Sequence, residues 1–409
     1  MKKFLAMLLA LVMALSLVAC GEQKQPDTPD VPDDGQQTAT VKVGFITLHD
    51  ENSTYDLNFI NAAKEAIANL GLTDADYILK TNVPEGQECY EAAVDMVDKG
   101  CNIIFADSFG HEPYMIQAAQ EYPDVQFCHS TGTRAHTEGL ANYHNAFASI
   151  YEGRYLAGIA AGLKLNEMID AGKFTADEAM VGYVGAFTYA EVVSGYTSFF
   201  LGVRSVCPTA TMKVTFTGSW YDEALEKEGA QKLIGLGCKL ISQHADSLGA
   251  PTACENANVP NVSYNGSTQA AAPNTYIISS RIDWAPYYEY AIKAVMNGTT
   301  IDTDWTGTLA TGSVVLTDLN TAVAAEGTAE AIAAATEKLE KGELHVFDTS
   351  TFTVKGEALT SYKADVDTDA DYTPDTEVVH DGYFSESEFR SAPYFDLEID
   401  GIERLDVAF

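Results

Sequence analysis

The stretch GCNIIFADSFG (residues 100–110) decides the fold, because a similar stretch, GCKLISQHADSLG, begins 137 residues later at Gly237. Each stretch follows a segment with helical spacing of apolar residues and runs through a short apolar strand into polar residues. VGFIT at Val43 and VGYVG at Val181 repeat the pattern at an offset of 138 residues. The repeat predicts two lobes of like topology; chance likeness between buried strands, whose composition is restricted, is the alternative.

Strands and helices alternate around these stretches. Residues 41–48 and 78–81 are typical of further buried strands, and residues 58–67 and 87–98 have helical spacing. This alternation predicts parallel sheets covered by helices on both faces, so the expected fold class is α/β. Ligands of open parallel sheets bind beyond the carboxyl ends of the strands, so these loops would line one cleft if the lobes face each other.

The composition excludes several classes of protein. The chain has 409 residues, 46% of them hydrophobic, which is too apolar for a disordered chain and long enough for two or three domains. Its 59 acidic against 24 basic residues give a formal charge of -35. Such a charge repels phosphate backbones, so we expect no nucleic-acid partner.

Motifs for catalysis and cofactor binding are not found in the sequence. H-E-x-x-H, G-x-S-x-G and P-loop patterns are missing, and the seven cysteines show no C-x-x-C spacing. The acidic stretch at residues 365–371 begins like a calcium-binding EF-hand loop. It has Ala370 where that loop needs Gly and Thr376 where it needs Glu, so a solvated acidic loop is the stronger prediction. We expect no metal and no cofactor.

The first twenty residues predict secretion. Two lysines precede an apolar run at residues 4–19, which is shorter than the roughly 20 residues of a membrane-spanning helix. The run ends in SLVACG and resembles a bacterial lipobox, which implies cleavage before Cys20 and a lipid anchor on it. An ordinary secretory signal with an incidental cysteine is the alternative. Residues 20–40, rich in proline and acids, predict a flexible tether.

Aromatic residues gather at the predicted strand ends, and they suit a flat ligand because rings stack on such ligands. Each one alone is more often a packing residue. Asp246 is the best candidate acceptor for a ligand N–H group, with a helix N-cap as the alternative role. The aromatic candidates are Tyr55, Phe109, Tyr143, Phe187, Tyr196, Trp220 and Trp284.

Several motifs in the same order resemble the basic membrane protein (BMP) family. They are the lipobox, YEGRYLAG at Tyr151, VGYVG at Val181 and GSWYD at Gly218. Members are substrate-binding lipoproteins of ABC transporters that bind purine nucleosides or purine bases. QHADS at Gln243 and DWAPYY at Asp283 look closest to an adenine-type branch.

The resemblance, which covers about residues 41–300, implies a type I periplasmic-binding-protein fold. Two Rossmann-like lobes would be joined by a three-crossover hinge, one lobe holding residues 41–142 and 266–305 and the other residues 143–265 and 306–409. The implied role is capture of a purine outside the cytoplasmic membrane and its delivery to permease and ATPase subunits. Catalysis is not implied.

Carried over by position, Tyr55 would stack on the purine, and Asp56 replaces an Asn common in relatives. Asn265 stands where nucleoside binders often have Asp, and Arg281 where they have Lys, which favours a base or a modified nucleoside. The full set of expected ligand contacts is Tyr55, Asp56, Phe109, Tyr143, Phe187, Tyr196, Trp220, Asp246, Ser247, Asn265, Arg281 and Trp284.

Three alternatives stay open at this stage. The same fold serves sugar binding, a surface recognition lipoprotein would need no transporter, and a nucleoside hydrolase would cleave what it binds.

Overall fold

The computed structural model describes residues 40–366 and 373–409. The expected signal peptide (residues 1–19), the lipidation site Cys20 and the tether up to residue 39 lie outside the described residues, as does most of the acidic stretch after Asp365. Within the described ranges, no helix combines the length and the apolar character needed to cross a bilayer.

The first lobe is built on a six-stranded, all-parallel sheet in the order β11-β5-β4-β3-β1-β2. Its strands are β1 (Val43–Ile46), β2 (Tyr77–Lys80), β3 (Ile103–Ala106), β4 (Gln126–Ser130), β5 (Tyr143–Ala148) and β11 (Asp304–Gly307). Its helices are α2 (Thr54–Asn69), α3 (Gln87–Asp98), η1 (Phe109–His111), α4 (Glu112–Glu121), α5 (Ala135–Glu138) and α10 (Ala285–Asn297).

The second lobe contains a seven-stranded sheet in the order β12-β10-β9-β8-β6-β7-β19, in which only β12 is antiparallel to its neighbour. Its strands are β6 (Met180–Gly185), β7 (Thr211–Phe216), β8 (Leu240–Gln243), β9 (Asn261–Tyr264), β10 (Tyr276–Ile282), β12 (Val314–Leu316) and β19 (Ile402–Arg404). Its helices are α6 (Ile150–Asp170), η2 (Ala176–Glu178), α7 (Ala190–Val206), α8 (Glu223–Gly235), α9 (Gly249–Ala257) and α11 (Thr328–Glu340).

The two sheets confirm the predicted repeat. The order β3-β1-β2 in the first lobe corresponds to β8-β6-β7 in the second, and the repeated stretches supply β1, β3, β6 and β8. All residues of β1, β3 and β8 are buried, as expected of strands covered on both faces.

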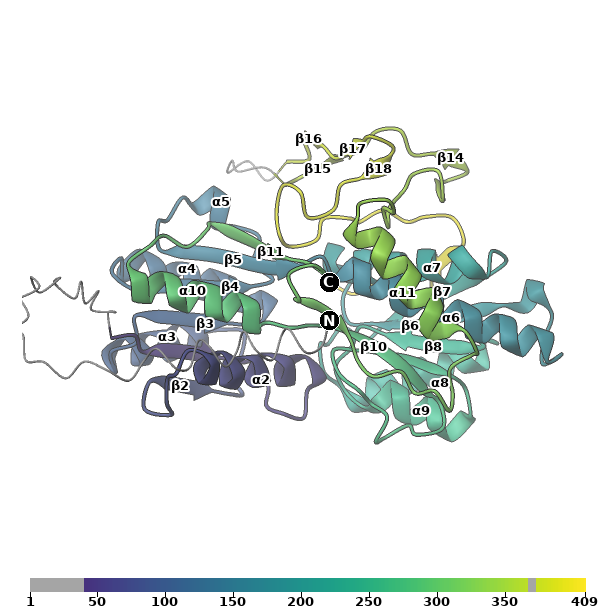
Figure 1. The fold of residues 1–409 in the computed structure, drawn as a ribbon, viewed down its shortest axis with the longest axis horizontal. Coiled ribbons are helices and arrows are strands. Elements are labelled where there is room, and N and C mark those ends of the chain that lie inside the picture. Colours follow the sequence, from purple (N-terminus) through teal and green to yellow (C-terminus); the bar gives the residue numbers. More distant parts are fainter. Residues whose placement is uncertain (1–39, 367–372) are drawn as a thin grey trace, which may run out of the picture. The chain divides into compact units, whose positions relative to one another are not determined.

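The chain crosses between the sheets three times: at Ser149, at Asp283 and through residues 308–313. Two of these places correct the expected boundaries after residues 142 and 265. Asn142 does not mark a change of lobe, because its side chain donates to the carbonyls of Ala119, Tyr122 and Val125 and so closes a turn within the first lobe. Asn265 ends β9 with a φ of 65°, and the chain then continues into β10 of the same sheet. Figure 1 shows α10 beside α2, although it follows β10 in sequence.

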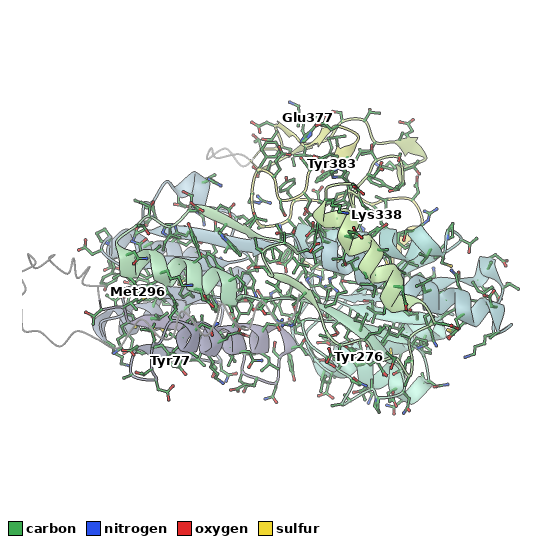
Figure 2. The ribbon with its side chains drawn as sticks, in the orientation of Figure 1. Tyr77, Tyr276, Met296, Lys338, Glu377 and Tyr383 are labelled. Atoms are coloured by element: carbon green, nitrogen blue, oxygen red, sulfur yellow. The ribbon has the colours of Figure 1, made fainter. Side chains whose placement is uncertain are left out.

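After α11 the chain packs on the second lobe through aromatic residues. Phe347 and Phe395 are buried and stacked, with ring centroids 4.4 Å apart. The short strands here are β13 (Thr353–Val354), β14 (Glu357–Ala358), β15 (Lys363–Ala364), β16 (Thr376–Glu377), β17 (Val379–His380) and β18 (Tyr383–Phe384). Figure 2 shows Glu377 and Tyr383 in this segment, above Lys338 of α11. Phe384, Tyr394 and Phe395 are buried in the core of this lobe, whereas Phe409 is exposed.

Candidate ligand-binding site

A nearly closed cavity of about 20 Å³ lies where the carboxyl ends of both sheets meet, the usual place for ligands in open parallel sheets. Both lobes contribute to it. The first lobe supplies Leu48, His49, Tyr55, Asp56, Ser108, Phe109 and Thr131, and the second supplies Glu191, Trp220, His244, Asp246, Tyr264 and Asn265.

Six of the twelve expected contacts line this cavity: Tyr55, Asp56, Phe109, Trp220, Asp246 and Asn265. The other six lie elsewhere: Tyr143, Phe187, Tyr196, Ser247, Arg281 and Trp284.

Tyr55 and Asp56 enter the cavity from the first turn of α2, which begins at the N-cap Ser53. The Tyr55 hydroxyl donates to the carbonyl of Asp107 at 2.6 Å, which fixes the ring against the end of β3. The Asp56 carboxylate accepts from the His49 amide at 2.7 Å and lies 3.3 Å from His49 Nδ1. Burial opposes ionisation of Asp56, but these His49 contacts and the Ser53 hydroxyl lower its pKa overall.

Asp107 lies next to Asp56, and its pKa is shifted in the opposite direction. Burial first, and the neighbouring Asp56 charge second, raise its pKa well above the usual value. Of these two adjacent buried carboxyl groups, Asp56 therefore ionises first.

A chain of contacts from the second lobe ends at Glu191. The buried Arg154 guanidinium stacks 3.2 Å from the Tyr264 ring centroid and donates to His244 Nδ1 at 2.9 Å. Since arginine only donates, His244 Nδ1 is an acceptor and its proton is on Nε2, which lies 3.5 Å from the Glu191 carboxylate. Burial, with the charge of Arg154, lowers the pKa of His244 to about 4, so this imidazole is neutral at neutral pH.

Asp246 lines the cavity rather than capping a helix. Its Oδ1 accepts a hydrogen bond from Asn265 Nδ2 at 2.9 Å. Helix α9 begins only at Gly249, and the Gly249 amide donates to Ser247 Oγ at 3.0 Å, so Asp246 does not cap this helix. Burial, then the carboxylates of Glu226 and Asp56, raise the pKa of Asp246 well above its usual value. The Asp246 carbonyl accepts from both the amide and the hydroxyl of Thr54, each at 3.1 Å, and so joins the lobes beside the cavity.

Aromatic rings close the mouth of the cavity. Phe109 of the first lobe stacks on Tyr189 of the second with centroids 5.2 Å apart. Tyr189 stacks in turn on Phe187 at 5.1 Å, and Phe187 meets the Trp220 ring edge to face at 5.0 Å. Phe187 is thus a support behind the cavity wall, where the sequence predicted a contact.

Thr131 is a cavity residue that the sequence did not indicate. It has a φ of 74°, a strained conformation for a β-branched residue, and its buried hydroxyl has no partner among the described residues. The loop after it is held by the Glu112 carboxylate, which accepts from the amides of Thr133 and Arg134 at 2.8 and 2.9 Å. The Tyr143 hydroxyl donates to the same carboxylate at 3.0 Å, so Tyr143 supports this loop through Glu112 and does not line the cavity.

The remaining expected contacts have structural surroundings. Trp284 is 1% exposed and stacks on Phe59 at 4.5 Å in the core of the first lobe. Tyr196 is fully buried in the second lobe against Tyr183. Arg281 lines a separate groove beside α2, where it is 3.3 Å from the Asp283 carboxylate, and the Ser247 amide is bonded to the buried Glu226.

Most of the residues that the sequence missed had a usable signal. His49, Ser108 and His244 lie in the loops that follow predicted strands, and Glu191 lies in the first turn of α7, just after such a loop. Thr131 follows β4, whose sequence QFCHS gave no strand signal, and Tyr264 lies inside β9 rather than beyond it.

The described residues contain no group of three or more His, Cys, Asp or Glu side chains that could hold a metal ion. Their six cysteines are buried as free thiols.

Comparison with known proteins agrees with the fold and the cavity. The family model of Bmp, the PnrA-like ABC transporter substrate-binding proteins, matches residues 44–346. A purine-binding protein of Brucella abortus (strain 2308) is 32% identical over 262 residues, which cover 63% of this chain and 70% of that protein. A Haloferax volcanii protein, provisionally named an ABC transporter glucose-binding protein, is 34% identical over 252 residues, covering 61% of this chain and 60% of that protein.

Solved structures show the same fold. An ABC transporter solute-binding protein from Conexibacter woesei DSM 14684 has a TM-score of 0.59 and 22% identity, covering 75% of this chain and 98% of that one. One from Aeropyrum pernix K1 has a TM-score of 0.62 and 18% identity, covering 75% and 93%. The predicted fold of the periplasmic-binding-protein type is confirmed.

The family match extends over most of the described chain and includes both lobes. Its members are substrate-binding proteins that act outside the cytoplasm with permease and ATPase components, and they are not enzymes. With two like lobes around one aromatic and acidic cavity, this chain belongs to the Bmp family of ABC transporter substrate-binding proteins.

Proposed function

We propose that this protein captures a purine, with an adenine-type base or nucleoside as the first candidate, and delivers it to the permease and ATPase subunits of an ABC importer. The observation that carries the proposal is the pairing of Asp246 with Asn265 inside an aromatic cavity. A carboxylate beside an amide offers acceptors and a donor to the edge of an aminopurine, while Tyr55 and Trp220 supply ring surfaces. The purine-binding relative from Brucella abortus supports the same class of ligand.

The position of Arg281 favours a base over a nucleoside. In the family resemblance this residue replaces a lysine that contacts ribose, yet its side chain lies in the groove beside α2 and pairs with Asp283. A ligand without a sugar needs no contact from it.

Closure of the lobes follows from contacts that the ligand makes with both of them. The cavity walls come from the two lobes, and Thr54–Asp246 and Phe109–Tyr189 contacts join them at its margin. A ligand that meets both walls only when they approach stabilises the closed state by that difference in affinity.

Membrane attachment is proposed through lipid on Cys20. Replacing it (Cys20→Ala) in an expressing bacterium should release the protein from the membrane fraction, and mass spectrometry of the native N-terminus should find a cysteine that carries two or more acyl chains. An unmodified N-terminus on the native protein would contradict the anchor.

A sugar is the second candidate, because the Haloferax volcanii relative carries a glucose-binding name. Mass spectrometry of small molecules released when the purified protein is denatured separates the two. We expect a purine among the released molecules; glucose or another hexose without any purine would favour the second candidate. A protein that carries and takes up no small molecule would support surface recognition instead.

A further inference from the structure

The segment Asp406–Phe409 lies beyond the part of the chain that the family match covers, yet it reaches the margin of the ligand cavity. The loop there, residues 186–189, joins β6 to α7 and is called the rim loop below. It carries Phe187 and Tyr189 of the aromatic mouth and leads directly to Glu191 in the cavity wall.

Two hydrogen bonds join the segment to the rim loop. The Thr188 amide donates to the Ala408 carbonyl at 2.7 Å, and the Ala408 amide donates to Thr188 Oγ1 at 3.0 Å. Residues 187–189 of the rim loop are only half-buried, so packing alone constrains them weakly.

Asp406 anchors the other end of the segment. Its carboxylate accepts from the Phe216 amide at 2.7 Å, the Thr215 hydroxyl at 2.6 Å and the Lys232 ammonium at 2.9 Å. These partners belong to the end of β7 and to α8, and β7 leads to the loop that carries Trp220. The segment therefore ties the rim loop to the strand end on its other side.

The contacts of the segment are polar, and its apolar side chains contribute little to the core. Val407 is 62% exposed and Phe409 is 81% exposed, while the neighbouring β19 is held separately by its pairing with β7. Because Asp406–Phe409 buries little apolar surface, its removal should cost little stability. Its hydrogen bonds to the rim loop should instead fix the geometry of the site.

We infer that Asp406–Ala408 is a positioning element for the ligand site, which holds the rim loop so that Glu191 lines the cavity and Phe187 and Tyr189 support the rings of Trp220 and Phe109. The effect on ligand affinity rests on the proposed purine function, whereas the effect on the loop does not.

Two variants test the inference against a matched control. One chain ends after Leu405, and the other carries Asp406→Ala in the full chain. The control is Val407→Ala, which alters an exposed side chain of the same segment and keeps its backbone hydrogen bonds. Amide hydrogen exchange is measured without ligand for peptides that span residues 186–192 and for core peptides of β6 and β8. Calorimetry then gives the dissociation constant for adenine.

Both test variants should exchange about tenfold faster at residues 186–192 and bind adenine about tenfold more weakly, with unchanged exchange in the core and a control like the parent. Unchanged exchange in the rim loop would overturn the inference, as would faster exchange with unaltered affinity. If the parent protein binds no adenine, the purine proposal fails, and the exchange measurement alone decides whether the segment positions the loop.

Discussion

At the scale of single residues, the buried carboxyl groups of the cavity make ligand binding depend on pH. The pKa of Asp246 is raised well above its usual value by burial and by Glu226 and Asp56. A ligand that donates N–H groups needs the ionised acceptor, so binding competes with the proton. Affinity for an aminopurine should therefore rise with pH as Asp246 loses its proton.

The variant Asp246→Asn tests this residue. It should weaken adenine binding by roughly ten- to a hundredfold and flatten the rise of affinity with pH. Calorimetry at several pH values provides the measurement, and Glu51→Gln, an exposed residue outside the cavity, is the matched control. An unaltered pH dependence in Asp246→Asn would assign the effect to another group.

Trp220 and Trp284 should behave in opposite ways. Trp284 is 1% exposed in the core, so Trp284→Ala should lower the free energy of unfolding by about 3 to 5 kcal/mol. Trp220 is half-buried in the cavity wall, so Trp220→Ala should mainly weaken ligand binding. Urea unfolding and calorimetry on both variants check the pair; a Trp284→Ala protein of parental stability would contradict the packing described here.

Only half of the residues that the sequence predicted as ligand contacts line the cavity, because the sequence does not determine which way a side chain points. An aromatic residue at a strand end can face the cavity, as Tyr55 and Trp220 do, or the core, as Trp284 and Tyr196 do. The direction depends on the local backbone, and the sequence pattern does not specify it. Asp246 could be predicted because it stands in QHADS, a motif that resembles the adenine-type branch of the family.

At the scale of elements, the crossing of α6 and α7 depends on glycine. A Cβ at Gly202 would clash with the Tyr155 carbonyl, whereas one at Gly235 in α8 meets nothing within 4 Å. Gly202→Ala should therefore destabilise the protein, and Gly235→Ala should stabilise it by about 0.5 to 1 kcal/mol through helix propensity. Thermal unfolding of both variants gives the comparison; equal effects would mean that the helices can separate at no cost.

Glu226 in α8 makes stability depend on pH. Burial raises its pKa to about 7 in the folded protein, above the value of an exposed glutamate. The folded state thus holds the Glu226 proton more tightly than the unfolded state does. The contribution of Glu226 to the free energy of unfolding is therefore complete below about pH 4.5 and is lost, up to about 3 kcal/mol, as pH rises through 7. Glu226→Gln should remove this share of the decline in urea unfolding at about pH 5 and about pH 8. The same decline in both proteins would exclude Glu226 as its source.

The sequence predicted strands that are continuous apolar runs, such as β1 and β3, but it did not predict β4, whose buried side chains include polar ones. β4 contains His129 and Ser130, both buried, and His129 Nε2 is 2.7 Å from the Ser108 carbonyl. Partners distant in sequence satisfy such groups, so hydropathy alone does not identify the strand. The lobe boundaries were misplaced for a related reason, because Asn142 and Asn265 look like linkers and are turns within one lobe.

At the scale of the whole molecule, a protein of large negative charge holds a cavity between two like lobes. The formal charge of -35, counted over the full sequence, repels polyanions such as nucleic acids. Inside the cavity, the acidic side chains favour a ligand that is rich in N–H donors. The family and the fold establish substrate binding, and the proposal of a purine rests on the chemistry of the cavity.

Calorimetric titration of the purified protein with adenine, adenosine and glucose under one set of conditions tests whether the cavity binds a purine. We expect saturable binding of adenine with one site per chain, competition by adenosine if the nucleoside also enters the cavity, and no heat from glucose. Saturable binding of glucose with no response to either purine would contradict it.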